Sequence, residues 1–210
     1  YSWVHKYHQD SFEKNTAFRH SLYLSPIIWS SIGEVVIAAR AAMDWLQKCS
    51  SVLSSSNECL KYTSPIGFPV LQKSVNYTSR QIWTQIGGRM RVRLATMTDE
   101  INSRKQRQGS SPNFVHHVDA THLMMTVNAA LEEGIVDFAM IHDDFGTHAA
   151  DADALQECIR RTFVQLHTEN DLLAEFKQVH EERTGIELPE LPNRGDLDIN
   201  EVIKSDYFFG

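Results

Sequence analysis

The sequence FAMIHDDFGTHA at residues 138–149 sets a histidine and two acids, His142, Asp143 and Asp144, directly after an apolar run. The run predicts a strand that enters a core. Because charge is costly to bury unless it is paired or holds a metal, the acids are expected at the edge of that strand. There a short carboxylate projects into a cleft, as nucleotidyl transfer requires, since Mg²⁺ prefers one or two carboxylates plus substrate phosphates. The alternative is a polar hairpin turn, which the local pattern by itself favours.

Three histidines, His116, His117 and His122, lie close together in the segment NFVHHVDATH at 113–122, and His148 follows the acidic edge. A cluster of this kind can ligate a transition metal. Such histidines also form hydrogen bonds with backbone or nucleotide groups, and a single histidine is usually structural. Both interpretations stay open on the sequence pattern.

In the segment RMRVR, the arginines Arg89, Arg91 and Arg93 alternate with apolar residues. A period of two places all three guanidinium groups on one face of a strand, and such a ribbon can enter a major groove or grip phosphates. Tyr77 and Trp83 lie on the opposite arm of the expected hairpin, as base-stacking or packing groups. The alternative is a solvated edge strand that its charges keep from pairing with other chains.

The charge distribution also indicates nucleic acid, although the net charge of the chain is −7. Residues 61–108 hold nine Lys or Arg and two acids, whereas residues 143–210 hold sixteen acids and six bases. Within the basic segment, SRKQRQGSSPN at 103–113 predicts a loop that either contacts a phosphate backbone or is simply solvated. A basic middle beside an acidic end is the asymmetry that a function must explain.

The surrounding pattern predicts an α+β fold with several helices packed on a small antiparallel sheet. Ser25 as N-cap and Pro26 at the first helical position predict the start of a helix that runs to about 46–53. Gly87-Gly88 predicts the turn of a hairpin over 75–95, and Gly134 the end of a helix over 119–133. The other expected elements are a polar loop at 99–113, a strand at 135–141 with its return at 145–147, and helices at 150–166, 170–183 and 199–204.

Composition restricts the class of protein further. The 210 residues contain 42% hydrophobic residues, as is usual in globular proteins, and no apolar run long enough to span a membrane, so we expect no membrane partner. The three cysteines have no CxxC spacing, which indicates a reducing compartment without a disulfide framework. The polar start without an initiator Met indicates no signal peptide and a piece of a longer chain.

Several of these segments occur together in one family. SRKQRQGSSPNFVHHVDATHLMMT followed by DFAMIHDDFGTHAAD resembles the single-subunit DNA-directed RNA polymerases of phages and mitochondria. The segments AAMDWL and GFPVLQ and the terminal Tyr-Phe-Phe-Gly are also similar, so the resemblance covers about residues 26–210. It implies a right-hand polymerase fold, in which residues 1–112 are the end of the fingers with a promoter-specificity hairpin at about 75–95, and residues 113–210 are the C-terminal part of the palm.

The resemblance also implies roles for single residues. Asp143 corresponds to one of two metal-binding catalytic aspartates, with Mg²⁺ as the cofactor, and His142 is its neighbour near the growing RNA 3′ end. His116 corresponds to the histidine of NFVH, which lies by the incoming ribonucleotide and the hybrid. The promoter-contacting candidates are Arg80, Arg89, Arg91 and Arg93. The implied partners are template and promoter DNA, nascent RNA, NTPs and the rest of the polymerase chain.

Two departures from the family pattern matter. Phage members mostly have a small residue after the HD pair, whereas this chain has Asp144, which on an alternating strand should face away from Asp143. The first catalytic aspartate and the fingers helix that holds the triphosphate lie upstream of these 210 residues. We therefore expect a C-terminal polymerase fragment that is inactive alone. The HDDFGT form predicts a phage or prophage protein in the cytoplasm of a bacterial host, rather than in the mitochondrial matrix.

Two other functions compete with the polymerase. In a metal-dependent phosphohydrolase of the H…HD…D type, His122, the pair His142-Asp143 and a later acid such as Asp171 would form the signature. In those enzymes the HD pair sits on a helix, whereas DFAMIHDDFG has strand character. The other alternative is a DNA-binding module built only on the arginine hairpin.

Overall fold

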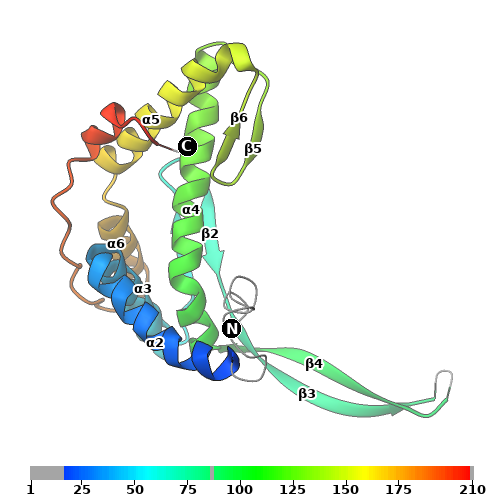
Figure 1. Cartoon of the computed structure of the whole chain (residues 1–210). Helices are drawn as coiled ribbons and strands as arrows, with labels where there is room; N and C mark the ends of the chain where they lie inside the picture. Colours follow the sequence, from blue (N-terminus) through cyan, green and yellow to red (C-terminus); the bar gives the residue numbers. More distant parts are fainter. Residues whose placement is uncertain (1–16, 86–87, 209–210) are drawn as a thin grey trace. The chain divides into compact units, whose positions relative to one another are not determined.

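The computed structural model describes residues 17–85 and 88–208 (Figure 1). The chain forms two compact units, and each is described by itself. The first comprises Tyr1–Asp44 with Pro192–Arg194, and the second comprises Trp45–Leu191 with Gly195–Gly210. Gly87, half of the expected Gly-Gly turn, lies outside the described residues.

The first unit contains helix α2 (Ala17–Val35) and the start of helix α3 (Ile37–Ser55). The predicted helix start at Ser25 is wrong, because Pro26 lies inside α2, and the break between the two helices falls at Val36. Proline inside a helix removes one backbone hydrogen bond and places its ring against the preceding turn. Here Pro26 is exposed, so water can satisfy the carbonyl that loses its partner.

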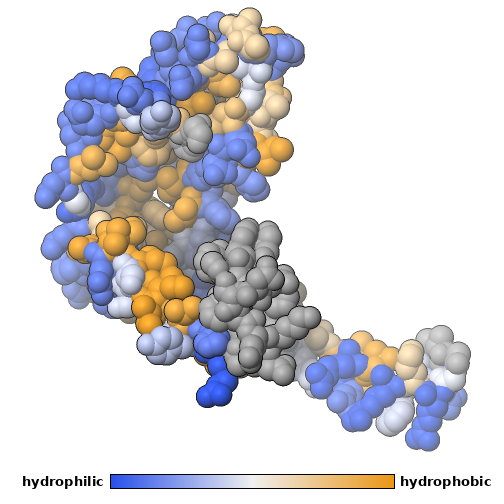
Figure 2. Space-filling model, in the orientation of Figure 1, coloured by the Kyte–Doolittle hydropathy of each residue, from blue (hydrophilic) through white to orange (hydrophobic). Residues whose placement is uncertain are grey.

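Large apolar side chains on α2 and at the start of α3 are exposed to solvent, and Figure 2 shows apolar residues gathered in this region. Among the described residues no single helix is long and apolar enough to cross a membrane. The bent pair of Phe18–Val35 and Ile37–Ser55 meets that criterion only when both helices are taken together. The exposed set is Phe18, Leu22, Tyr23, Ile27, Ile28, Trp29, Ile32, Val35, Val36 and Ile37.

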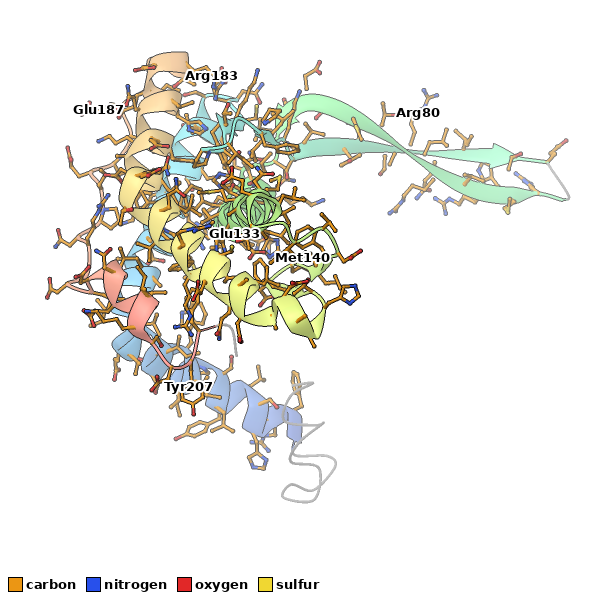
Figure 3. The ribbon with its side chains drawn as sticks, turned by 90° about the horizontal axis from the view of Figure 1, so that it is seen from above. Arg80, Glu133, Met140, Arg183, Glu187 and Tyr207 are labelled. Atoms are coloured by element: carbon orange, nitrogen blue, oxygen red, sulfur yellow. The ribbon has the colours of Figure 1, made fainter. Side chains whose placement is uncertain are left out.

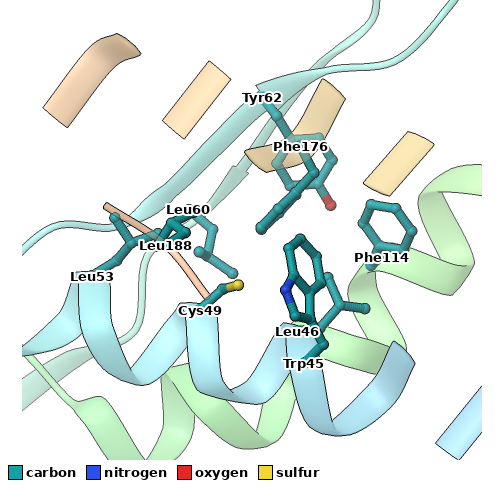
Figure 4. Close-up of a cluster of buried hydrophobic side chains, with 9 residues drawn as sticks. All are labelled: Trp45, Leu46, Cys49, Leu53, Leu60, Tyr62, Phe114, Phe176 and Leu188. Carbon is teal, nitrogen blue, oxygen red and sulfur yellow. The ribbon is translucent and has the colours of Figure 1, made fainter. Parts of the chain in front are cut away.

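The main core of the second unit is aromatic (Figure 4). Phe176 lies at its centre, with its ring centroid 5.3 Å from that of Tyr62, 5.7 Å from Phe114 and 5.9 Å from Trp45. Edge-to-face pairs of this kind add stability beyond the area that they bury. Burial raises the pKa of the Cys49 thiol to about 12, so this thiol acts as a small apolar group in the core.

Helix α4 (Ser103–Glu132) is the longest described element, and it corrects two expectations. Residues 103–113 are not a loop, and the helix expected at 119–133 is only its C-terminal half. Asn102 caps the helix by accepting a hydrogen bond from the backbone N–H of Lys105 at 3.0 Å. The expected stop is confirmed, since Gly134 follows the helix with φ of 89°.

Buried glutamines explain why the basic segment is helical. Gln106 is fully buried and donates to the carbonyl of Gln72 at 2.6 Å, while Gln72 donates to the carbonyl of Gln106 at 2.8 Å. The side-chain carbonyl of Gln106 also accepts from the backbone N–H of Ser74 at 2.9 Å. These three bonds anchor the first turns of α4 to the neighbouring strand, which local sequence does not reveal.

The strands form three separate antiparallel pairs in the described residues, rather than one small sheet. The α+β class is confirmed. The pairs are β1 (Leu60–Thr63) with β2 (Pro69–Gln72), β3 (Val75–Thr84) with β4 (Met90–Ile101), and β5 (Ala139–Ile141) with β6 (Asp144–Gly146).

The remaining helices agree with the sequence pattern. Helix α5 (Ala152–Glu169) packs along α4, and α6 (Leu172–Thr184) is capped by Asp171 and ends at Gly185 with φ of 67°. The short 3₁₀ helices are η2 (Ala149–Asp151) and η3 (Ile199–Lys204). The Arg160 guanidinium of α5 donates to the carbonyls of Ile203 and Ser205, which fastens the C-terminal segment to this helix.

Candidate active site and nucleic-acid interface

The hairpin of β5 and β6 carries the HD pair at its tip. Ile141 pairs with Asp144, so the turn consists of only two residues, His142 and Asp143. His142 has φ of 57°, in the left-handed region that two-residue hairpin turns require. Both turn side chains are exposed. The expected turn and return are therefore present, with the Asp143 carboxylate outside the core, but the strand predicted over 135–141 forms only over Ala139–Ile141.

Close backbone packing and one hydroxyl fix this hairpin. A Cβ atom on Gly146 would lie 3.0 Å from the carbonyl oxygen of Ala139, so glycine permits the two strands to approach. The hydroxyl of Thr147 donates to the carbonyl of Asp137 at 2.8 Å. Met140, which is labelled in Figure 3, and Phe145 are partly buried against the second core cluster. That cluster consists of Ala130, Ile135, Leu155, Cys158 and Ile159.

The hairpin folds back along α4. The ring centroids of Phe145 and His122 lie 5.6 Å apart in a T-shaped contact, and Figure 1 shows the turn facing back along the helix. His116 is exposed on α4, six residues before His122 and therefore roughly 9 Å nearer the helix start. The turn that bears Asp143 thus points back along α4 and not into the core.

The histidine–metal cluster that the sequence pattern left possible does not form in the part of the chain that the structure describes, where no group of three or more His, Cys, Asp or Glu is placed to hold a metal. His122 is buried, and its Nε2 lies 2.9 Å from the carbonyl of Ile159. His117 Nδ1 lies 3.2 Å from the carbonyl of Phe114. Burial lowers the pKa of both histidines, which favours neutral rings with structural partners. His148 instead pairs with Asp137 at 3.3 Å on the surface.

The β3–β4 hairpin divides the candidate arginines between two faces. Arg91 lies directly opposite Trp83, and Arg93 opposite Gln81, so these residues share one face. Arg80 pairs with Leu94 and lies on the other face. Figure 3 shows Arg80 on the projecting part of the hairpin.

Aromatic side chains organise the basic surface. The Cζ atoms of Arg89 and Arg91 lie 4.9 Å and 5.8 Å from the centroid of the Trp83 ring, within range of a cation–π contact. Lys105 of α4 holds its Nζ atom 5.8 Å from the Tyr77 ring, which joins the first turn of α4 to the base of the hairpin. Sequence alone did not reveal this second contact, because it depends on how the hairpin meets the helix.

The chain combines an exposed acidic hairpin tip with a basic two-stranded ribbon, and sequence comparison identifies its family. Residues 3–188 match the family of DNA-dependent RNA polymerases, to which this chain belongs. It is 35% identical over 207 residues to DNA-directed RNA polymerase 2, chloroplastic/mitochondrial, of Arabidopsis thaliana, which covers 97% of this chain and 20% of the relative. It is 37% identical over 195 residues to DNA-directed RNA polymerase 3, chloroplastic, of Nicotiana sylvestris, and this match covers 91% of this chain and 19% of the relative.

A third relative is DNA-directed RNA polymerase 1, mitochondrial, of Nicotiana sylvestris, with 35% identity over 206 residues and coverage of 94% and 19%. The chain therefore spans about a fifth of the length of these relatives. The expectation of a phage protein in a bacterial host is wrong, because these relatives are chloroplastic or mitochondrial polymerases. That expectation rested on the HDDFGT form, and one acid after the HD pair does not identify a compartment.

Proposed function

We propose that this chain is the part of a DNA-directed RNA polymerase that supplies one metal-binding aspartate and a promoter-contacting hairpin. One observation carries the proposal: Asp143 stands exposed at the two-residue tip of a β-hairpin, in a chain 35% identical to such polymerases. In this proposal residues 1–112 belong to the fingers and residues 113–210 to the palm, and the division falls inside α4.

The proposed reaction is templated RNA synthesis. The 3′-hydroxyl of the RNA attacks the α-phosphate of an NTP, and a new O–P bond forms. The bond between the α-phosphorus and the oxygen that bridges to the β-phosphate breaks, and pyrophosphate leaves. The proton of the hydroxyl passes to a base or to water. Bound Mg²⁺ would neutralise the charge that develops on these oxygens. The partners are accordingly template and promoter DNA, nascent RNA and NTPs.

The residues of this chain would provide one of the two metal-binding carboxylates of such a site, together with the histidines near it. The exposed carboxylate of Asp143 is a hard oxygen ligand of the kind Mg²⁺ prefers, and a rigid two-residue turn limits where it can move. His142 stands beside it and would lie at the RNA 3′ end, while His116 would contact the incoming ribonucleotide. A second carboxylate and the groups that hold the triphosphate would come from the rest of the polymerase chain.

Three observations argue against the phosphohydrolase. The HD pair lies in a β-turn rather than on a helix, and His122 is occupied by the carbonyl of Ile159. Asp171 accepts from the backbone N–H of Ala174 as the cap of α6. The DNA-binding module remains compatible with the polymerase proposal, because the β3–β4 hairpin would serve both.

The test uses a complete polymerase that contains this sequence. Asp143→Asn should abolish RNA synthesis and preserve promoter binding, because the carboxamide keeps the shape of the turn but lacks the charge. Asp144→Asn, on the neighbouring residue, is the matched control and should retain most synthesis. Full turnover by the Asp143 variant would refute the assignment.

A second assay uses the 210-residue chain alone with promoter template, Mg²⁺ and NTPs. We expect no product, since one carboxylate without its partner does not complete a two-metal site. Templated RNA synthesis by the isolated chain would contradict the fragment proposal.

A further inference from the structure

The β3–β4 hairpin has one face that carries two exposed aromatic rings together with Arg91 and Arg93. Trp83 is 62% exposed and Tyr77 is 51% exposed, and both lie on β3 with side chains on the same face. Residues 77–97 contain four arginines and no acidic residue, so nothing within this segment neutralises them. Figure 2 shows the hairpin as largely hydrophilic with an apolar patch part-way along it.

The two faces differ in character. Ile82 and Val92 are half-buried and pair on the face that also carries Arg80. The face that carries Trp83 instead carries Arg91 and Arg93, which lie on the partner strand β4. A tryptophan left this open gains little from burial, so its packing within the hairpin does not account for it.

The arginines hold the indole ring in place. Arg89 and Arg91 approach the Trp83 ring to 4.9 Å and 5.8 Å and still leave more than half of the side chain exposed. Because two guanidinium groups contact the Trp83 ring, its orientation is restricted, and it offers a flat surface with positive charge beside it. That combination matches a nucleic-acid strand with one base against the ring and its phosphates beside the arginines.

We propose that Trp83 is a stacking site for an unpaired DNA base, with Arg89 and Arg91 binding the phosphates of the same strand. In a duplex the faces of the bases are covered by their neighbours, so an exposed indole distinguishes single-stranded from double-stranded DNA. The inference rests on the proposed function, in which this hairpin contacts promoter DNA, and it adds that the contact is to the melted strand. Arg80, on the opposite face, takes no part in it.

The first experiment measures binding of the 210-residue chain to a fluorescently labelled 12-nucleotide DNA strand and to the duplex of the same sequence. Trp83→Leu should weaken binding to the single strand by about 5- to 100-fold, the range expected for loss of one base–aromatic stack, and change duplex binding less than about 2-fold. Trp83→Phe should retain most of the affinity, because a smaller ring still stacks.

Arginine variants provide a matched pair for the charge. Arg91→Ala and Arg80→Ala each remove one guanidinium from the same hairpin, but only Arg91 contacts the indole ring. Arg91→Ala should weaken single-strand binding more than duplex binding and reduce the salt dependence by about one phosphate contact, whereas Arg80→Ala, at a promoter-contact candidate outside the stacking face, should weaken both kinds of binding to a similar extent. Equal effects of the two variants would overturn the face assignment.

A spectroscopic measurement separates stacking from loss of folding. A strand that contains 2-aminopurine should change its fluorescence on binding to the unaltered chain and to Trp83→Phe, but not to Trp83→Leu, with the melting temperature of all three chains compared. A fluorescence change of 2-aminopurine with Trp83→Leu as large as that with the unaltered chain, equal losses for single strand and duplex, or tighter binding of the same sequence as RNA would refute the proposal. If no DNA binds at all, promoter contact by this hairpin fails as well. The Asp143→Asn assay is independent of either result.

Discussion

The ring of His122 in α4 meets the ring of Phe145 in β6 edge to face, with 5.6 Å between the centroids. Phe145 is two residues from Asp143, so this contact ties the acidic tip to the longest helix. His122 is itself fixed, because it is buried and its Nε2 lies 2.9 Å from the carbonyl of Ile159 in α5. The position of the candidate metal ligand thus depends on an aromatic contact outside the turn.

We expect Phe145→Leu to lower the free energy of unfolding by about 1 kcal/mol, because the aromatic contact is lost while most of the apolar volume remains. Urea denaturation of the isolated chain measures this. Val136→Ala is the control, since Val136 is 71% exposed, and it should change stability little. In a complete polymerase the same Phe145 variant should lower kcat, and unchanged turnover would show that the contact does not position Asp143.

Buried histidines predict that stability falls with acid. His180 is fully buried, with Nδ1 2.7 Å from the carbonyl of Phe176 and Nε2 accepting from the backbone N–H of Lys61 at 3.1 Å. Burial lowers its pKa below the usual 6.5, and the same direction holds for the pKa values of His117, His122 and His167. Below pH 6.5 the unfolded chain binds protons that the folded chain does not, so each such histidine reduces stability by up to about 1.4 kcal/mol per pH unit.

Unfolding free energies measured between pH 7.5 and 5.5 test this expectation. The free energy of unfolding should have its full value above pH 6.5 and decrease below that pH. His180→Gln retains an acceptor for the Lys61 N–H but cannot titrate, so it should show a shallower decline than the unaltered chain. A profile identical to that of the unaltered chain would exclude His180 from the effect.

The reciprocal glutamine bonds predict a loss of stability when either side chain is removed. Gln106→Ala removes two side-chain bonds, leaving the backbone carbonyl of Gln72 and the backbone N–H of Ser74 without these partners. Each unsatisfied buried group costs about 1–3 kcal/mol, so this variant should be clearly destabilised. Gln72→Ala removes the third bond, which its side chain donates to the backbone carbonyl of Gln106, and should also lower stability in urea denaturation; unchanged stability of either variant would contradict these bonds.

The close approach of β5 and β6 predicts intolerance at one glycine. Gly146→Ala places a Cβ atom 3.0 Å from the backbone oxygen of Ala139, which cannot move as a side chain could. We expect a loss of about 1 kcal/mol or more from the strain. Gly195→Ala is the matched control, because no atom lies within 4 Å of the added Cβ, and it should be neutral. Equal stabilities would show that the hairpin opens freely.

The acidic hairpin and the arginine hairpin were predictable because turn residues and alternating strands leave local signals. The face on which Arg80 lies was not predictable, because it depends on how many residues form the turn between β3 and β4. The helix at 103–113 was missed for a different reason: glycine, two serines and Pro112 weaken its local helical signal, and the bonds between Gln106 and Gln72 compensate from outside. The histidine cluster failed as a metal site because His117 and His122 point to separate carbonyl groups.

The left-handed backbone of His142 has a further consequence for protein engineering. An L-residue with φ of 57° is held in a conformation that glycine adopts without penalty, so a library selected only for thermal resistance should favour glycine at this position. A library selected for transcription should keep the imidazole if it acts beside Asp143. Comparing the two selections at this one codon would show whether the residue serves the fold or the chemistry.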